Sequence, residues 1–177
     1  MQNLIKTEYY SSPIGELILG SFNDKLCLCD WRYRKMRSSI DSRLKTGMNA
    51  IFIEERSNIV TETITQLKNY FKGKKPKFDI PLLLVGTDFQ KDVWNALLEI
   101  PYGKTNTYIG LAKELNNENA IRAVATANGA NAISIIIPCH RIIGNNGGLV
   151  GYAGGLEAKM KLLKLENALV GNQLSLF

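Results

Sequence analysis

The chain has 177 residues, of which 45% are hydrophobic and 21% are charged, proportions that fit an ordinary globular protein of one or two small domains. Its start lacks the pattern of a signal peptide, no apolar run is long enough to span a membrane, and three cysteines are an odd number for a secreted disulfide framework. We therefore expect a cytoplasmic protein with no membrane partner. The net charge of +6 is concentrated in residues 1–84, which hold 14 Lys and Arg against 9 Asp and Glu, and is by itself weak evidence for a polyanionic partner.

The first thirty residues predict a β-meander. The runs LIKTEYY, ELILGSF and KLCLCDW are rich in β-forming residues and alternate in polarity, and turn sequences separate them. We expect Trp31, at the end of the third run, to lie in the core. The basic stretch at 32–45 that follows fits either a helix or a mobile loop.

One helix and one further strand are expected before a domain boundary. Residues 58–71 fit an amphipathic helix with Ile64, Leu67 and Phe71 spaced for one face. The segment FDIPLLLV, residues 78–85, predicts a strand that ends at the boundary.

From Thr87 onward the pattern changes to helices. Thr87 and Gln90 form a capping box, with a hydroxyl at the N-cap and a glutamine three residues later. Apolar residues then follow at helical spacing, namely Phe89, Val93, Trp94 and Leu97. We expect Trp94 to be a core residue.

Two short helices are expected next, at residues 108–115 and 118–128, joined by the polar turn NNEN. This arrangement is typical of a helix-turn-helix. The runs RII and LV flank GNNGG at 144–148 and predict a hairpin. Residues 156–169 predict a closing helix.

Together these elements predict an α+β fold of two domains. Residues 1–85 form a small N-terminal α/β domain, in which a helix packs on a sheet. Residues 86–177 form a mostly helical C-terminal domain that contains a winged-helix-like helix-turn-helix.

Cys139 is the strongest candidate for a reactive residue, although most cysteines are small buried hydrophobes. It lies in the sequence Pro138-Cys139-His140-Arg141, and neighbouring cations favour the thiolate, which is the nucleophilic form. His140 is the single histidine of the chain, so its place beside Cys139 favours Cys–His chemistry. Adjacency does not establish it, because adjacent side chains often point apart.

Cys27 and Cys29 are two residues apart in a predicted strand and would face the same side of the sheet. We favour core packing over a metal pair, because a structural zinc usually needs four Cys or His ligands. The remaining candidates are Cys139 and His140, which are better explained as a reactive pair. We therefore expect no metal and no cofactor.

Arg122 lies in AIRAVATA, residues 120–127, a would-be recognition helix that is otherwise made of small and apolar residues. Direct reading of the major groove requires several long polar side chains, so a small-residue face suits a narrow groove better. The segment fits equally well a packed alanine-rich helix with one solvated arginine.

The sequence IPCHRII, preceded by ANGANAIS and followed by GYAGGLEAKMKLLKLE, resembles the O6-alkylguanine-DNA alkyltransferases, also called methylated-DNA–protein-cysteine methyltransferases. The resemblance includes FQKDVWNALLEIPYGKTNTYIGLAKEL and covers residues 87–166, whereas the N-terminal half is similar only in length and layout. It implies a DNA repair protein that transfers a methyl or other alkyl group from O6-alkylguanine irreversibly to its own Cys139, once per molecule. The implied partner is double-stranded DNA containing this lesion, bound by a monomer; activity on O4-alkylthymine stays open.

The resemblance also implies roles for the residues around Cys139. Cys139 would accept the alkyl group, His140 would take its proton through a bound water, and Glu166 would orient the imidazole. Tyr108 would assist proton transfer to the leaving base. Asn131 would lie at the hinge between the recognition helix and the active-site loop.

The remaining implied roles concern DNA. Arg122 would enter the stack where the flipped nucleotide had been, with Ala123 and Ala127 in the minor groove. The implied substrate pocket consists of Tyr152, Ala153 and Ile142. Guanine O6 is buried in a duplex, so the base must leave the stack at a cost of roughly a few kcal/mol.

Two positions depart from the family pattern, because Ala132 and Ser134 stand where relatives often carry proline. This predicts a pocket wall of different shape or rigidity. No Cys and His set matches the zinc site that some relatives have in the N-terminal domain.

Three other kinds of protein are weighed against this one. A module that recognises alkylguanine without repairing it would lack the reactive cysteine. A winged-helix transcription regulator would carry a charged recognition helix. A cysteine hydrolase would show acyl chemistry, with burst kinetics on esters.

Overall fold

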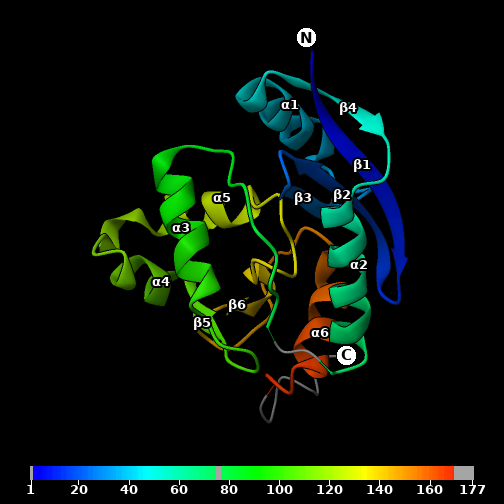
Figure 1. The fold of residues 1–177 in the computed structure, drawn as a ribbon. Coiled ribbons are helices and arrows are strands. Elements are labelled where there is room, and N and C mark those ends of the chain that lie inside the picture. The colour runs from blue at the N-terminus through cyan, green and yellow to red at the C-terminus, as the bar shows by residue number, and fades with distance from the viewer. Residues whose placement is uncertain (1, 75–76, 170–177) are drawn as a thin grey trace. The chain divides into compact units, whose positions relative to one another are not determined.

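The computed structural model describes residues 2–74 and 77–169. The chain divides into two compact units, residues 1–87 and 88–177, which are described separately (Figure 1). The sequence predicts a division between residues 85 and 86. Among the described residues, no helix is long and apolar enough to cross a membrane.

The first unit contains the predicted β-meander, formed by β1 (Asn3–Ser12), β2 (Gly15–Phe22) and β3 (Lys25–Trp31). The turn between β2 and β3 places Asn23 and Asp24 at φ values of 47° and 55°, the left-handed backbone that a tight hairpin requires. A fourth strand that the sequence did not indicate, β4 (Ala50–Glu54), pairs in parallel with β1, so the sheet order is β3-β2-β1-β4.

Two helices accompany this sheet. The basic stretch at 32–45, which fitted either a helix or a loop, is helical from Arg37, where α1 (Arg37–Met48) begins, and the helix continues three residues beyond it. The predicted amphipathic helix is confirmed as α2 (Asn58–Phe71), which starts where the Ser57 side chain accepts a hydrogen bond from the Val60 backbone. α2 contacts β1, β2 and β3 (Figure 1). Its buried residues are Val60, Thr63, Gln66, Leu67 and Tyr70, so the predicted face is displaced, with Ile64 and Phe71 half-buried.

The predicted strand at 78–85 is wrong. The segment joins β3 through an isolated bridge between Leu26 and Leu82, in which Leu26 donates to Pro81 and Leu83 donates back to Leu26. Pro81 has no N–H to donate, so this stretch is poorly suited to a longer ladder. Its apolar composition reflects an extended chain packed beside the sheet.

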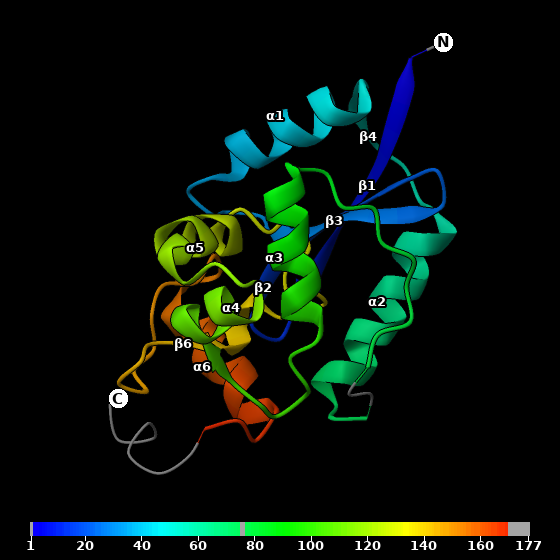
Figure 2. The same cartoon turned by 90° about the vertical axis from the view of Figure 1, so that its left-hand side faces the viewer.

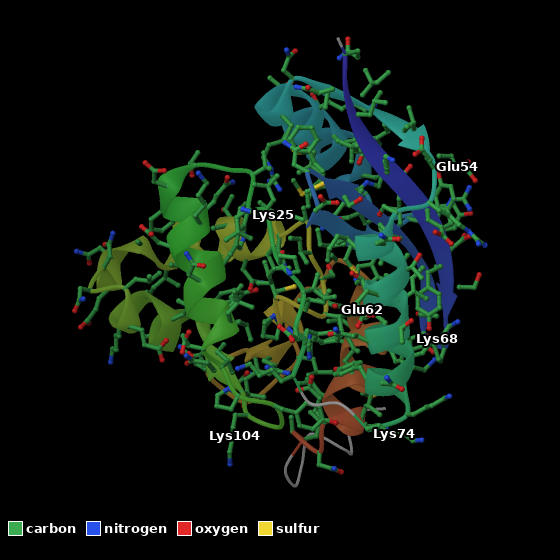
Figure 3. The ribbon with its side chains drawn as sticks, in the orientation of Figure 1. Lys25, Glu54, Glu62, Lys68, Lys74 and Lys104 are labelled. Carbon is green, nitrogen blue, oxygen red and sulfur yellow. The ribbon has the colours of Figure 1, made fainter. Side chains whose placement is uncertain are left out.

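The basic excess of the first unit is spread over several elements. Lys25 begins β3, Lys68 lies on α2, and Lys74 follows α2; all three side chains are exposed and are labelled in Figure 3. Because these positive charges lie on different elements, the net charge of the unit does not by itself indicate a surface that binds a polyanion.

The second unit begins with α3 (Asp88–Leu98) and continues with the short strand β5 (Asn106–Thr107). The predicted helix-turn-helix follows as α4 (Tyr108–Glu114) and α5 (Ile121–Gly129), with the 3-10 turn η1 (Glu118–Ala120) between them. α4 and α5 both contact α3 (Figure 2). The N-cap of α4 is Thr107, whose side chain accepts a hydrogen bond from the Gly110 backbone.

The rest of the second unit consists of the 3-10 turn η2 (Cys139–Arg141), the short strand β6 (Ile142–Ile143) and α6 (Gly155–Leu165). The predicted hairpin around GNNGG is wrong, because β6 pairs in parallel with β5. The GNNGG turn itself forms, closed by the Gly144 N–H donating to the Gly148 carbonyl at 2.8 Å. The carbonyl of Val150, where a return strand would lie, instead accepts from the side chain of Lys159.

α6 is shorter than the sequence indicates. It ends at Leu165 rather than 169, because Asn167 adopts a left-handed φ of 54°. Glu166 therefore occupies the C-cap position, where its side chain leaves the helix axis near the Cys139 turn.

Candidate functional site

Cys139 lies in a buried loop between α5 and β6. Its side chain is 3% exposed, and its backbone N–H donates to the Ile137 carbonyl at 2.8 Å. Two further backbone bonds close the loop, from Ile136 to Ser134 and from Ile137 to Ile133. Ile135 has a φ of 72°, a strained conformation for a β-branched residue that persists only where its surroundings enforce it.

The side chain of Asn131 ties this loop together. Its Nδ2 donates to the Ile137 carbonyl at 3.0 Å and to Cys139 Sγ at 3.3 Å, and its Oδ1 accepts from the Ile133 backbone at 2.9 Å. Asn131 is 1% exposed. A donor aimed at sulfur stabilises a thiolate more than a neutral thiol, so Asn131 both places the nucleophile and favours its reactive form.

His140 and Glu166 form a buried pair, with Nε2 of the imidazole 2.8 Å from Oε1 of the carboxylate. A carboxylate only accepts hydrogen bonds, so Nε2 carries the hydrogen and Nδ1 is the acceptor of a neutral imidazole. Burial lowers the pKa of His140 below its ordinary value, and this effect outweighs the opposing one of Glu166. Nδ1 is buried without a hydrogen-bond partner among the described residues. The site therefore holds a neutral base with an open nitrogen.

Glu166 is held by several donors at once. Arg141 donates from Nε to Oε2 at 2.8 Å and from Nη2 to Oε1 at 3.0 Å, and the Gly103 N–H donates to Oε2 at 3.3 Å. Burial raises the pKa of Glu166, but hydrogen bonds and charge from His140 and Arg141 outweigh it and hold that pKa well below its usual range. Glu166 is thus a fixed carboxylate.

Gly103 fits closely against the end of α6. Its φ is 75°, and a Cβ at this position would lie 2.9 Å from the Glu166 carbonyl oxygen. The neighbouring Tyr102 hydroxyl donates to the Leu165 carbonyl at 3.1 Å. The turn after α3 therefore positions the carboxylate, and glycine is required there.

Lys159 is a buried cation that the sequence analysis missed. Its Nζ donates to the carbonyls of Ile142 and Val150, the latter at 2.8 Å. Burial lowers its pKa to about 8, while nearby Cys139 opposes this shift. Its position in the sequence could have predicted this burial, because Lys159 lies three and four residues before the buried Leu162 and Leu163 and therefore on the same face of α6.

The predicted pocket residues lie in different environments. Tyr108 is half-buried at the start of α4; burial raises its pKa, negative charge on Cys139 adds to this, and a hydrogen bond from Asn128 opposes it. Tyr152 is half-buried, with its ring centroid 6.4 Å from that of His140. Ala153 is also half-buried, whereas Ile142 is fully buried.

The exposed side of α5 carries Arg122, Ala123 and Thr126. Ala127, expected in the minor groove, is 2% exposed and its carbonyl accepts from Trp94 Nε1 at 2.9 Å, so it belongs to the packed side of the helix. The sequence analysis missed Thr126, which the i, i+4 spacing from Arg122 would have indicated.

Cys27 and Cys29 are buried thiols in the sheet, as expected for packing residues. Burial raises the pKa of Cys27 to about 12 and that of Cys29 further, so neither thiol is a ready nucleophile. Within residues 2–74 and 77–169, no group of three or more His, Cys, Asp and Glu side chains could hold a metal ion.

Comparison with known proteins agrees with this geometry. Residues 88–168 match the model of the 6-O-methylguanine DNA methyltransferase DNA binding domain, and residues 5–84 match that of its ribonuclease-like domain. The methylated-DNA–protein-cysteine methyltransferase of Methanosarcina acetivorans is 45% identical over 160 residues, covering 90% of this chain and 96% of the relative. The Mycobacterium leprae protein of the same name is 41% identical, covering 98% and 99%.

Solved structures are similar over the same extent. The crystal structure of the Mycobacterium tuberculosis O6-methylguanine methyltransferase has a TM-score of 0.78 at 38% identity, covering 98% of this chain and 99% of that one. The structure of Mycobacterium tuberculosis OGT in complex with DNA has a TM-score of 0.77 at the same identity and coverage.

A buried Cys–His–Glu arrangement beside a helix-turn-helix defines a DNA-binding protein with a cysteine nucleophile. With both domain models matched and relatives above 40% identity along nearly the whole chain, the chain belongs to the methylated-DNA–protein-cysteine methyltransferase family.

Proposed function

We propose that this protein repairs DNA by moving an alkyl group from O6 of a damaged guanine to Sγ of Cys139, irreversibly and once per molecule. The observation that carries the proposal is the site itself. Cys139 Sγ accepts a hydrogen bond from Asn131, and the adjacent His140 is a neutral imidazole with an open, buried Nδ1. Both lie in the part of the chain that matches the DNA binding domain.

The reaction begins with removal of the thiol proton. His140 Nδ1 takes this proton through a bridging water, and Glu166 stabilises the imidazolium that results, because its carboxylate already accepts from Nε2. The thiolate attacks the alkyl carbon, a C–S bond forms, and the C–O6 bond breaks with its electron pair passing to the guanine. Tyr108 donates a proton to the departing base and regains one from solvent. The C–S bond of the resulting thioether is stable, so the thiol is not regenerated and each molecule transfers one alkyl group.

DNA binding is assigned to the exposed face of α5. Arg122 and Ala123 face outward, so a small-residue surface can approach a minor groove while Arg122 takes the place of the flipped nucleotide. Residues 86–177 would bind DNA and accept the alkyl group, and residues 1–85 would support them. The protein would act as a monomer in the cytoplasm, without metal or cofactor.

A direct experiment is to incubate the protein with a duplex that contains one O6-methylguanine. The lesion should disappear, and the intact protein mass should rise by one methyl group in place of one hydrogen. A lesion that persists beside an unmodified, folded protein would contradict the proposal. Bound but unrepaired lesion would favour a recognition module instead.

A further inference from the structure

The turn between β3 and α1, residues 32–36, is anchored by a buried carboxylate (Figure 2). Asp30, near the end of β3, is fully buried, and its two oxygens accept hydrogen bonds from Arg34 Nη1 at 2.9 and 3.1 Å. Arg37, the first residue of α1, donates to the same carboxylate at 2.8 Å. One buried group therefore holds a residue inside the turn and the residue directly after it, and these charge-assisted bonds fix the turn against the sheet.

The anchored turn presents aromatic and cationic side chains to solvent. Tyr33 is 78% exposed, the highest fraction among the large hydrophobic side chains of the described residues. Lys35 and Met36 are exposed as well. The guanidinium of Arg32 lies 4.0 Å from the ring centroid of Tyr9, a residue of β1 that is 41% exposed, and 5.2 Å from that of Tyr33. We call this group of five side chains the Tyr9–Tyr33 surface.

Arg32 links the two rings of this surface. Its backbone N–H donates to the Glu16 carbonyl at 3.0 Å, and its Nη1 donates to the Glu16 carboxylate at 2.9 Å. The guanidinium is therefore fixed beside Tyr9 and Tyr33, and its attraction to the rings restricts their motion. A ring that is already ordered loses little conformational entropy when it binds a partner.

The segment that carries most of this surface has a surplus of positive charge. Residues 32–45 contain six Lys and Arg residues and one acidic residue, Asp41. Within the described residues, Asp41, Asp30 and Glu16 form ion pairs with three of the arginines. Six positive charges thus stand against three negative ones, which leaves a surplus of three. This local surplus, in contrast to the net charge of the whole unit, lies next to exposed aromatic rings and favours a polyanionic partner.

Exposed aromatic rings beside cations are suited to single-stranded nucleic acid, because bases stack on the rings while the cations contact phosphates. Stacking of this kind needs an unpaired base, since neighbouring base pairs cover both faces of each base in a duplex. The DNA binding domain of the family matches residues 88–168, so the Tyr9–Tyr33 surface lies outside it. We propose that this surface is a second DNA contact, which binds single-stranded DNA by stacking a base on Tyr33 and pairing a phosphate with Lys35.

The stacking contact is tested by equilibrium binding of the full-length protein to a fluorescent, lesion-free oligothymidine of about sixteen nucleotides and to a lesion-free duplex of the same length. Tyr33→Ala removes a ring that is mostly exposed, so the variant should fold normally. Its affinity for the single strand should fall by about fivefold or more, the loss of one stacked base, while its affinity for the duplex stays unchanged. Tyr33→Phe keeps the ring and should bind the single strand as the natural protein does.

The phosphate contact is tested by the salt dependence of the same binding. Lys35→Ala should reduce the slope of log K against log salt concentration for the single strand by about 0.7, the contribution of one phosphate contact. Lys68→Ala is a matched control, because Lys68 is an exposed lysine on α2 of the same unit, and it should leave the slope unchanged.

Four outcomes would overturn the second DNA contact. They are an unchanged single-strand affinity in Tyr33→Ala, an equal loss on the duplex, a loss of the same size in Tyr33→Phe, and a slope in Lys35→Ala that equals that of Lys68→Ala. The first of these would leave the exposed turn to a protein partner. Alkyl transfer from duplex DNA should be the same in all four variants, so failure of this inference is distinguishable from failure of the proposed function.

Discussion

Replacing Arg141 by methionine should destabilise the protein by about 3–5 kcal/mol, the cost of removing one partner from a buried ion pair. The side chains of Arg141 and Glu166 are 8% and 0% exposed. Arg141 donates twice to the carboxylate and once to the Ile100 carbonyl, and the variant loses these bonds together. Methionine preserves most of the packing volume, so the loss measures the uncompensated carboxylate rather than a cavity.

The double variant Arg141→Met with Glu166→Gln separates charge from packing. Each single change leaves one buried charge without the opposite charge that it pairs with, whereas the double change removes both charges. Its cost should therefore be smaller than the sum of the two single costs, by a coupling near the upper end of the roughly 0.5–3 kcal/mol found for contacting residues.

Equilibrium unfolding in denaturant at constant pH measures these free energies, with the slope checked for each variant. Arg32→Met is a matched control, because Arg32 pairs with Glu16 while the two side chains are 37% and 28% exposed, and it should cost far less. Equal losses in Arg141→Met and Arg32→Met, or additive losses in the double variant, would refute the idea that Glu166 is held as a buried carboxylate by Arg141.

Three further outcomes follow from the site. Because burial lowers the pKa of His140 below its ordinary value of 6.5, more than half of the imidazole is neutral at pH 6.5, and the single-turnover rate there should keep more than half of its value at pH 7.5; a rate that falls below half would contradict the lowered pKa. Arg122→Ala should slow transfer from duplex DNA far more than from the free O6-alkylguanine base, which needs no flipping, and equal losses would remove Arg122 from that step. The pKa of Lys159 falls from 10.5 to about 8 on folding, so the unfolded chain binds more protons between these values and this lysine makes stability rise with pH in that window. Lys159→Met should abolish that contribution in unfolding curves at pH 7.5 and 9.5, and an unchanged pH dependence would show that Lys159 is not the group responsible.

Sequence patterns within single segments correctly predicted three parts of the fold. The meander, α2 and the helix-turn-helix have alternation, helical spacing and turn residues within each element, and all three form. Residues 78–85 and 149–150 have strand-like composition but form no strand. The first segment makes only one isolated bridge to β3, because Pro81 has no N–H to donate, and in the second the Val150 carbonyl accepts from Lys159. Long-range contacts of this kind leave no periodic trace in the sequence.

In the candidate site, too, residues in a specific sequence motif were predicted, whereas residues whose role depends on distant contacts were missed. Cys139, His140 and Glu166 were indicated by a specific motif, and the structure brings His140 and Glu166 to 2.8 Å. Lys159 was missed, because a buried lysine needs carbonyl partners and the sequence does not show that a distant loop supplies them. Ala127 was placed on the wrong side of α5, since a run of alanines does not reveal which face packs against Trp94.

The central claim is that Cys139 alone receives the alkyl group, and peptide mapping tests it most directly. After reaction with excess duplex containing O6-methylguanine, proteolysis and mass spectrometry should find one methyl group per protein, on the peptide containing Cys139. The peptide containing Cys27 and Cys29 should be unmodified, because burial raises the pKa of both thiols. Methyl on that peptide, or more lesions repaired than protein molecules present, would contradict the account.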